Sequence, residues 1–329
     1  MLSPDVAAVR LAVRTALAPL EGSDATVLVA LSGGPDSLAL AAATAFEAPR
    51  LGLGVASATI DHGLQAGSAD VAARAAAQAR DTGIAEARTV RVEVAVGAGP
   101  EAAARDARHA ALRAVAAETG AAAVLLGHTL DDQAETVLLG LARGAGAGSL
   151  AGMSPHRLDE RGLAWIRPLL AIRRAQTEAF CAASGLEAWS DPHNHEERFS
   201  RVRVRRTVLP LLESELGPGV ADALARTAEQ LREDNEAFAD MIDETIEDIV
   251  EHVDAGIAIS VSALAANPPA LRHRIIRHVA RSEFGASLTR TQTLEVARLV
   301  SGWRGQGPID LPGFTAAREA GLIRLVARS

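Results

Sequence analysis

The chain of 329 residues contains no lysine, so all 33 of its basic residues are arginine. A phosphate loop of the Walker type depends on a lysine, and that class of nucleotide site is therefore excluded. The single cysteine, Cys181, excludes an internal disulfide framework and any zinc site built from several cysteines. Such scarcity of cysteine fits a reducing compartment.

Long apolar runs are also missing, and no uninterrupted stretch is long enough to span a bilayer. The segment 1–17 carries Asp5 and Arg10 among its apolar residues, which is typical of an amphipathic helix and not of a signal peptide. We therefore expect no membrane partner and a cytoplasmic location. The formal net charge of −8 argues against a surface that is basic throughout, but it leaves room for a local basic segment.

Strand-like and helix-like segments alternate along the first part of the chain. The expected strands are 26–31, 53–60, 88–94 and 122–126, and the expected helices include 69–81, 101–118 and 131–143. This order predicts an α/β fold with a doubly wound, mainly parallel sheet and helices on both faces. Because right-handed crossovers place the carboxyl ends of parallel strands at one edge, the motifs after the first and fourth strands should lie close together.

The second part of the chain has a different character. Segment 144–152 is glycine-rich and predicts an active-site loop, and 191–206 is expected to be irregular. One long helix is expected over 220–253, with an apolar face at helical spacing and an acidic face that suits a solvated connection between domains. A short strand, two helices and a hairpin-like segment follow. Two domains are predicted. The first covers residues 1–212, and the second covers 213–329 and consists of a linker helix with a smaller, mainly helical C-terminal domain.

The first strand is followed by the segment Ser32-Gly33-Gly34-Pro35-Asp36-Ser37. Two glycines let the backbone turn tightly, and a proline suits the first position of a helix. Backbone amides and the helix dipole then form an anion site, with the two serine hydroxyls as further donors. A lone Gly-Gly pair would more often be an ordinary capped turn, but the whole hexapeptide is a more specific signal for an anion site than the pair alone. A carboxylate at Asp36 beside bound phosphate requires a cation between them, which predicts Mg²⁺ there.

Two further groups of polar residues follow strands at the same predicted edge. Asp61 and His62 end the second strand, where a carboxylate suits ribose or base atoms and equally suits a turn with glycine behind it. After the fourth strand come His128, Thr129, Asp131, Asp132, Glu135 and Thr136. Thr129 and Asp132 form a capping pair, which explains one acid but not all three. The acids suit Mg²⁺ or an attacking amine, and His128 suits developing phosphate charge.

A basic segment precedes the long helix and contains Arg198, Arg201, Arg203, Arg205 and Arg206. In an extended chain its alternate arginines would project to one side, as contact with an RNA backbone requires, and Phe199 could stack on a base. A solvated charged loop is the alternative. A second, weaker patch contains Arg272, His273, Arg274, Arg277, His278 and Arg281. We expect Trp189 and Trp303 to be packing residues.

These motifs resemble those of the PP-loop ATP pyrophosphatases and, among them, of the tRNA(Ile)-lysidine synthetase family. The resemblance rests on SGGPDS, DHGL, EAAARDARHAAL, HTLDDQAET, RGAGAGSLAGM, RPLL and DPHN with EERFSRVRVRR, which occur in the order and spacing of that family. It covers roughly the first two thirds of the chain closely and the rest loosely, including WRGQGPIDLPG near the end.

The resemblance implies that ATP adenylates the wobble cytidine of tRNA(Ile) with a CAU anticodon. The amine of free L-lysine then displaces AMP and forms lysidine, after release of pyrophosphate. By the same resemblance the hexapeptide at residue 32 and its neighbours Asp61 and His62 hold ATP and Mg²⁺, and the acids around Asp131 serve the chemistry. Arg105 and Arg108 are expected near the substrate. Two positions depart from the family pattern, Gln65, where an arginine is usual, and His109, where an aromatic residue is usual.

Other functions remain as alternatives at this point. A tRNA thiolase of the PP-loop class would need paired cysteines, and a glutamine-dependent amidase would need a further domain. A synthetase of the GMP or NAD type would lack the row of arginines. A nucleotide sensor would need the glycine-rich turn but not the acids, and a plain RNA-binding module would leave the first domain unexplained. The sequence leaves a homodimer open.

Overall fold

A computed structural model describes residues 3–63, 67–92, 100–191, 196–253 and 256–328. Gln65 lies outside these residues, as does the segment 192–195 of the expected irregular region. The chain divides into two compact units, Met1–Arg232 and Glu233–Ser329. No helix among the described residues is long and apolar enough to cross a membrane.

The first unit is built around a sheet with the strand order β3-β2-β1-β4-β6-β5. Its strands are β1 (Thr26–Ala30), β2 (Gly54–Asp61), β3 (Glu86–Arg91), β4 (Ala121–Leu125), β5 (His156–Leu158) and β6 (Ala164–Ile166). All neighbours pair in parallel except β5 and β6, which form an antiparallel hairpin at one edge. Successive residues of β1 point to opposite faces, so Val27 and Val29 enter one apolar core and Leu28 the other.

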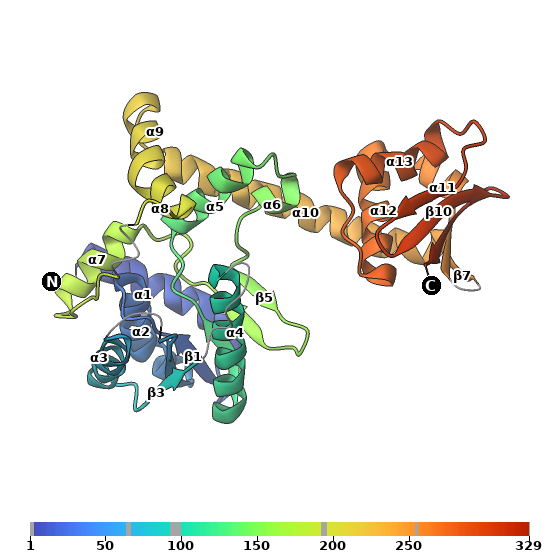
Figure 1. Cartoon of the computed structure of the whole chain (residues 1–329). Helices are drawn as coiled ribbons and strands as arrows, with labels where there is room; N and C mark the ends of the chain where they lie inside the picture. The colour runs from blue at the N-terminus through green and yellow to red at the C-terminus, as the bar shows by residue number, and fades with distance from the viewer. Residues whose placement is uncertain (1–2, 64–66, 93–99, 192–195, 254–255, 329) are drawn as a thin grey trace. The chain divides into compact units, whose positions relative to one another are not determined.

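Helices cover both faces of this sheet, which confirms the doubly wound α/β class (Figure 1). One face packs against α1 (Pro4–Leu17), α2 (Pro35–Glu47), α3 (Ser68–Asp81) and α7 (Arg174–Ala183). The other face packs against α4 (Pro100–Thr119), which contributes Leu112, Val115 and Ala116. Short 3-10 turns, η1 (Ala18–Leu20) and η2 (Ala48–Leu51), end α1 and α2. The observed strands begin and end within three residues of the expected ones.

A smaller group of helices forms a third apolar cluster in the first unit. It contains α5 (Leu130–Ala142), α6 (Ala147–Leu150), α8 (Ser200–Arg203), the π-helical turn η4 (Val204–Val208), α9 (Leu209–Leu216) and the start of α10 (Val220–Ile249). Leu130 and Ala134 of α5 pack there against Val204, Leu209 and Ala221. Figure 1 shows these helices gathered beside one another. This cluster holds α5 in place, so it also fixes the acids that α5 carries.

The second unit combines helices with an antiparallel sheet of order β7-β8-β11-β10-β9. Its elements after α10 are β7 (Val250–Val253), β8 (Gly256–Ser260), α11 (Val261–Ala266), α12 (Pro269–Phe284), α13 (Arg290–Ser301), β9 (Ile309–Leu311), β10 (Phe314–Glu319) and β11 (Leu322–Ala327). The expected short strand, helices and terminal hairpin are present. Ala320 and Gly321 close that hairpin, both with positive φ, as a two-residue turn requires.

The expectation of a helix up to residue 253 was wrong, because α10 ends at Ile249. Val250–Val253 instead forms β7 and pairs with β8. This pairing is a tertiary contact that the local residue pattern does not reveal. The expected division of α10 into two faces is confirmed, since Phe238, Ile242 and Ile249 pack in the core of the second unit while the acidic side chains are exposed.

Candidate active site

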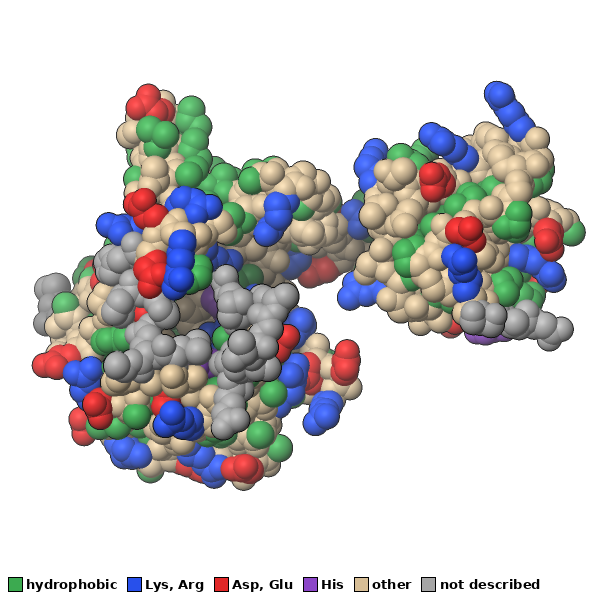
Figure 2. All heavy atoms as spheres, in the orientation of Figure 1, with side chains coloured by type: hydrophobic (Ala, Val, Ile, Leu, Met, Phe, Trp, Pro, Cys, Tyr) green, Lys and Arg blue, Asp and Glu red, His purple; other side chains and the backbone are tan. Residues whose placement is uncertain are grey.

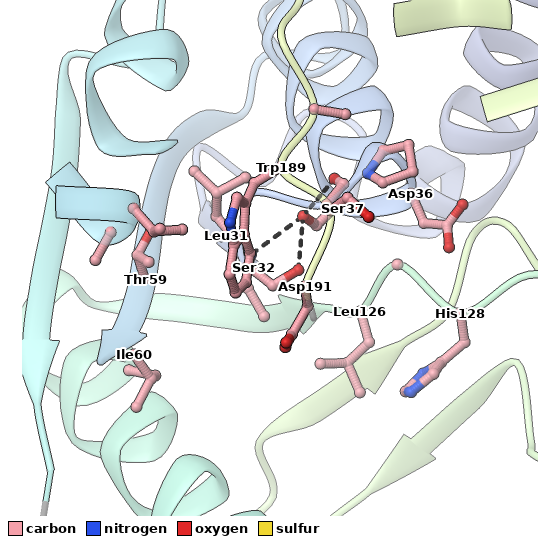
Figure 3. Close-up of a pocket in the computed structure, with 18 of the residues that line it drawn as sticks. Leu31, Ser32, Asp36, Ser37, Thr59, Ile60, Leu126, His128, Trp189 and Asp191 are labelled. Carbon is pink, nitrogen blue, oxygen red and sulfur yellow. Dashed lines mark hydrogen bonds between the residues drawn. The ribbon is translucent and has the colours of Figure 1, made fainter. Parts of the chain in front are cut away.

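A cavity of about 1000 Å³ opens at the carboxyl edge of the parallel sheet. The strand order reverses between β1 and β4, and such a reversal is where α/β sheets bind their ligands. Figure 3 shows Ser32 from the loop after β1, Ser37 from the first turn of α2 and His128 from the loop after β4 around this one cavity. The predicted adjacency of the two motifs is confirmed. The predicted residues that line the cavity are Ser32, Gly34, Pro35, Asp36, Ser37, Asp61, His62, Arg108, His128, Asp132, Arg205 and Arg206.

The loop after β1 is held in shape by its own residues. Gly33 has φ of +84°, a conformation that favours glycine, and Gly34 is the N-cap of α2 with Pro35 in its first turn. The Ser32 amide donates to the Ser37 hydroxyl over 3.1 Å, and the two serine hydroxyls lie 3.0 Å apart. The loop therefore presents hydroxyls and the positive end of the α2 dipole to the cavity, as an anion site requires.

Three further residues of this cavity were not expected at a ligand site. A Cβ on Gly127 would lie 3.1 Å from the backbone of Asp36 and Ser37, so a larger residue there would push the backbone of the loop away by a few tenths of an ångström. Trp189 lies on the cavity wall instead of serving only as packing, and its amide donates to the Gly33 carbonyl over 2.9 Å (Figure 3). Cys181 also lines the cavity, but it is buried, which raises the pKa of its thiol to about 12.

Asp61 and His62 form the wall contributed by β2. The Asp61 carboxylate accepts a hydrogen bond from the Gly63 amide over 2.9 Å, as a turn-forming aspartate does. Hydrogen bonds from the Ser68 hydroxyl and the Gly63 amide hold the pKa of Asp61 below its usual value. His62 has a buried Nδ1 atom without a hydrogen-bond partner among the described residues, and burial lowers its pKa. Both interpretations of Asp61 are therefore compatible: it shapes the turn and it faces the cavity.

The acids of α5 meet arginines from two other helices. The capping pair is confirmed, because the Thr129 amide and hydroxyl donate to Asp132 Oδ2 over 2.8 and 3.0 Å. Asp132 Oδ1 accepts from Arg174 over 2.9 Å and from Arg205 over 3.2 Å. Glu135 is fully buried and binds Arg205 through both carboxylate oxygens, at 2.6 and 3.1 Å. Burial alone would raise the pKa of Asp132, but the charges of Arg174 and Arg205 and the hydrogen bond from the Thr129 amide lower it below its usual value.

Arg174 connects the acids of α5 to the loop after β1. Its Nε atom lies 3.1 Å from Asp36 Oδ2, its Nη2 atom 2.9 Å from Asp132, and its Nη1 atom 3.6 Å from Glu135. The Thr177 hydroxyl donates to the other oxygen of Asp36. Burial raises the pKa of Asp36, and Arg174 and Thr177 oppose that shift. One guanidinium group therefore joins Asp36 of α2 to two carboxylates of α5 that lie far from it in the sequence.

The sequence contained a signal for Arg174 that we did not use. Arg173 and Arg174 begin α7, and cations at the start of a helix oppose its dipole. Such an arrangement needs acidic partners. Arg173 has them in Asp131, at 3.1 Å, and Asp222, at 2.7 Å. Asp131 also accepts from the Arg174 amide over 2.7 Å, so it supports the start of α7 and does not line the cavity.

The expectation of an extended basic segment was wrong, because residues 200–208 form α8 and η4. Val202 and Val204 are buried, and a helical backbone turns Arg201 and Arg205 toward α5. Arg201 lies 3.7 Å from Glu135 and donates to the Thr136 hydroxyl over 2.9 Å.

The remaining arginines of this segment have other surroundings. Arg203 points elsewhere and donates to the backbone carbonyls of Glu197 and Arg198, over 2.6 and 3.0 Å. Arg198 pairs with Glu196 at 2.5 Å and lies over the Phe199 ring. The arginines of the segment therefore do not form a row on one side. On the face of the first unit drawn in Figure 2, basic and acidic side chains are interspersed, as the net charge led us to expect.

His128 and Arg108 form a wall of the cavity. Burial lowers the pKa of His128 to about 3, so its ring is neutral at physiological pH. The Nδ1 atom of His128 and the Nε atom of Arg108 are buried without a hydrogen-bond partner among the described residues. Buried polar atoms are usually hydrogen-bonded, so both atoms are available to a ligand or to water in the cavity. His128 can therefore donate a hydrogen bond to a ligand, but it contributes no positive charge.

In the second patch of arginines, only part of the set faces solvent. Arg272 donates to the carbonyls of Leu264, Ala265 and Asn267 and so caps the end of α11. Arg274 donates to Asn235 over 2.8 Å and covers the Phe238 ring. Those two arginines therefore serve the structure of the second unit. The exposed members are Arg277 and Arg281.

His109 stands at a position where the family usually has an aromatic residue. Its ring stacks on Trp165 with centroids 4.6 Å apart and an angle of 14°. Burial and four surrounding arginines lower its pKa to about 4. The ring is therefore a neutral stacking partner near pH 7, which is the role an aromatic side chain would have.

We expect His109→Phe to keep the stability of the wild-type protein at pH 7, whereas His109→Ala loses about 2 kcal/mol through the lost stacking and packing. Because the folded pKa lies below the usual value of 6.5, His109 stabilises the fold above pH 6.5 and this contribution falls as the pH drops toward 4. His109→Phe should lack that pH dependence. Urea unfolding between pH 4.5 and 8 measures both effects, and equal losses in the two variants would contradict the stacking role.

Two family models match the chain, a PP-loop domain over residues 9–212 and a TilS substrate binding domain over residues 259–324. The tRNA(Ile)-lysidine synthase of Leifsonia xyli subsp. xyli is 58% identical over 300 residues, which cover 91% of this chain and 89% of that protein. The tRNA(Ile)-lysidine synthase of Salinispora tropica is 51% identical over 330 residues, which cover 99% and 97% of the two chains.

Among solved structures, the chain is similar to the U34-tRNA thiolase NcsA from Methanococcus maripaludis with its 4Fe-4S cluster. The match has a TM-score of 0.59 at 21% sequence identity and covers 70% of this chain and 79% of that one. At this identity the likeness concerns the fold alone. The single cysteine of this chain, Cys181, is too few to ligate such a cluster.

Proposed function

The chain belongs to the tRNA(Ile)-lysidine synthase family, and we propose that its amine substrate is free L-lysine and its RNA substrate tRNA(Ile) with a CAU anticodon. It uses ATP to modify tRNA. In the proposed reaction the wobble cytidine attacks the α-phosphorus of ATP and pyrophosphate leaves. The lysine amine then forms a bond to the activated carbon of the base, the bond to the adenylate oxygen breaks, and AMP and a proton are released. The meeting of the phosphate loop and the α5 acids in one cavity carries this proposal. We place the reaction in the cytoplasm, where tRNA is found.

The loop at the end of β1 is proposed to hold the phosphates of ATP. Ser32 and Ser37 supply hydroxyl donors, while Gly33, Gly34 and Pro35 give the tight turn into α2 whose dipole favours anions. The β2 wall lies at the other side of the same cavity, which suits the nucleoside part of ATP. Asp61 and His62 supply the polar side chains of this wall.

The residues present fit a Mg²⁺ ion that arrives with ATP. No group of three or more metal-ligating side chains exists among the described residues, so a cage made by protein alone is absent there. Mg²⁺ in nucleotide sites is usually held by one or two carboxylates together with phosphate oxygens and water. Asp36, in the first turn of α2, is the carboxylate of the loop. When bound, the ion would neutralise phosphate charge, and Asp36 would exchange part of its contact with Arg174 for it.

The pair Asp132 and Glu135 is proposed to hold the amine substrate. Both carboxylates already bind the guanidinium groups of Arg174 and Arg205, so the site is built for a cation with several N–H donors. Because the pKa of Asp132 is lowered, this carboxylate stays ionised and holds the ammonium group instead of accepting its proton. Asp131 supports the site through the start of α7, and neutral His128 donates a hydrogen bond.

RNA binding is proposed for arginines around the mouth of the cavity and for the second unit. Arg206 lines the cavity, and Arg198 and Arg203 lie on the exposed side of the same segment. Arg201 and Arg205 face the acids of α5 and so connect RNA binding to the amine site. On α4, Arg108 lines the cavity and Arg105 lies one turn away from it. The TilS substrate binding domain of residues 259–324 supports a tRNA-binding role for the second unit.

The test is pyrophosphate release from ATP in the presence of lysine, with isoleucine tRNA bearing a CAU anticodon compared with methionine tRNA bearing the same anticodon. We expect release only with the isoleucine tRNA, together with incorporation of labelled lysine. Release that needs neither lysine nor tRNA would contradict the proposed acceptor. Protection by ATP without any release would favour a nucleotide sensor. Light scattering of the same sample distinguishes a monomer from a homodimer.

A further inference from the structure

A second cavity, of about 330 Å³, lies beside α4 and is separate from the one that contains the phosphate loop. It is lined by Arg105, Asp106, His109, Arg113 and Arg157. Arg157 comes from the edge strand β5, and the others come from consecutive turns of α4. Figure 1 shows α4 and β5 next to each other, and an ion pair of 2.8 Å between Arg113 and Asp159 joins them.

The charges around this cavity do not balance. Arg113 is neutralised by Asp159, which also accepts from the Trp165 indole over 3.2 Å. Arg105 and Arg157 are exposed, and neither has an ion-pair partner among the described residues. Asp106 is the one acid of the lining. Two guanidinium groups are thus left pointing to a concave, solvated site.

A buried arginine behind the cavity strengthens its positive field. Arg167 is 8% exposed, and its Nε atom has no hydrogen-bond partner among the described residues. Burial and the charges of Arg157 and Arg105 lower the pKa of Arg167 to about 10, and the same arginines lower the pKa of His109. Mutual repulsion of this kind destabilises the unliganded protein, and an anion between the arginines would relieve it.

The floor of the cavity is rigid and uncharged. The neutral ring of His109 is stacked on Trp165, and Trp165 is fully buried in the core between α4 and the sheet. Arginines spaced around such a floor match a phosphodiester group, because a planar guanidinium forms two parallel hydrogen bonds to phosphate oxygens. Arg157 is exposed on the edge strand β5, which leaves the site open to a long chain, an opening that a free nucleotide would not need.

We propose that Arg105 and Arg157 together bind one phosphodiester group of the RNA substrate over the His109 ring. The proposal rests on the proposed function, because it takes the tRNA of that reaction as the ligand. It assigns the β5–β6 hairpin, which carries none of the predicted site residues, to RNA binding. The nucleotide bound there is distinct from the cytidine that reacts at the phosphate loop.

Arg157→Ala tests the site, with Arg161→Ala as the matched control. Arg161 is exposed on the same hairpin, in the turn between β5 and β6, and does not line the cavity. We expect Arg157→Ala to raise Kd and KM for tRNA about tenfold and to reduce the salt dependence of log Kd by about one phosphate contact. Its kcat and its KM values for ATP and lysine should stay within about twofold of wild type.

Arg105→Ala should likewise raise Kd for tRNA and reduce its salt dependence, and the double variant should lose about two phosphate contacts. Unchanged tRNA affinity in Arg157→Ala, or an equal loss in Arg161→Ala, would overturn the proposal. An equal rise in KM for ATP would also overturn it, because the cavity would then belong to the nucleotide site. Direct tRNA binding is measured without turnover, so the two proposals are tested separately. A wild-type protein that transfers no lysine would refute the proposed function, whereas the phosphate contact would still be supported if Arg157→Ala weakens tRNA binding and Arg161→Ala does not.

Discussion

Replacing Asp36 by alanine is expected to lower tRNA-dependent pyrophosphate release by about 10³-fold or more, because the loop then offers no carboxylate to a cation on the phosphates. The structure adds a second reason, since Asp36 also positions Arg174 and Thr177 at the start of α7. Pyrophosphate release at saturating ATP, with Mg²⁺ varied over a wide range, measures the effect. ATP should still bind weakly, since the hydroxyls and the helix dipole remain.

Asp5→Ala is the matched control, because Asp5 is likewise an acid in the first turn of a helix, α1, but lies outside the cavity. It should keep wild-type turnover. An Asp36→Asn variant keeps the shape of the side chain and removes the charge, so it should be as inactive as the alanine variant. Undiminished turnover in either Asp36 variant would refute the role of this carboxylate in holding Mg²⁺.

Replacing Arg174 by alanine is expected to destabilise the first unit by about 3–5 kcal/mol, because it leaves buried carboxylates without their common cation. Asp36 keeps only the Thr177 hydroxyl, and Asp132 and Glu135 keep Arg205. Urea unfolding measures the loss, with Arg226→Ala as the control. Arg226 is an exposed arginine of α10 without an ion pair among the described residues.

The loss should depend on pH with a definite sign. Without Arg174 the folded pKa of Asp36, already raised by burial, rises further above its unfolded value. A raised folded pKa means that stability is lost as the pH increases through it. The deficit of Arg174→Ala should therefore be smaller at pH 4.5 than at pH 7.5, because ionised Asp36 is the form that lacks a cation. A deficit that stays constant over this range would show that packing, and not charge, is what Arg174 contributes.

Features set by neighbouring residues could be predicted from the sequence. The turn at Gly33, the helix start at Pro35 and the capping pair of Thr129 with Asp132 all depend on contacts within a few residues. The alternation of strands and helices likewise predicted which motifs share the carboxyl edge of the sheet, since crossover handedness leaves few arrangements. The loop after β1 and Asp132 therefore line one cavity, as the alternation predicted, and their roles stay predictions.

The sequence-based predictions failed where a residue contacts a partner that is distant in the sequence. Arg174 lies 138 residues from Asp36, and no local pattern connects them. Arg201 and Arg205 were assigned to an extended chain, but burial of Val202 and Val204 against other helices makes that segment helical. Val250–Val253 continues the pattern of α10 and still becomes a strand, because β8 offers it a partner.

The sequence by itself determined the α/β class, the glycine-rich turn after β1, the sheet edge at which the two motifs meet and the absence of a thiolase-type cysteine set. Backbone geometry and strand order determine these features, and both are encoded in short segments. Only the tertiary structure decided that Arg174 joins three carboxylates, that Trp189 forms a cavity wall, and that Arg157 comes to lie beside α4. Charge compensation acts through space, so the partner of a buried ion is known only when the chain is folded.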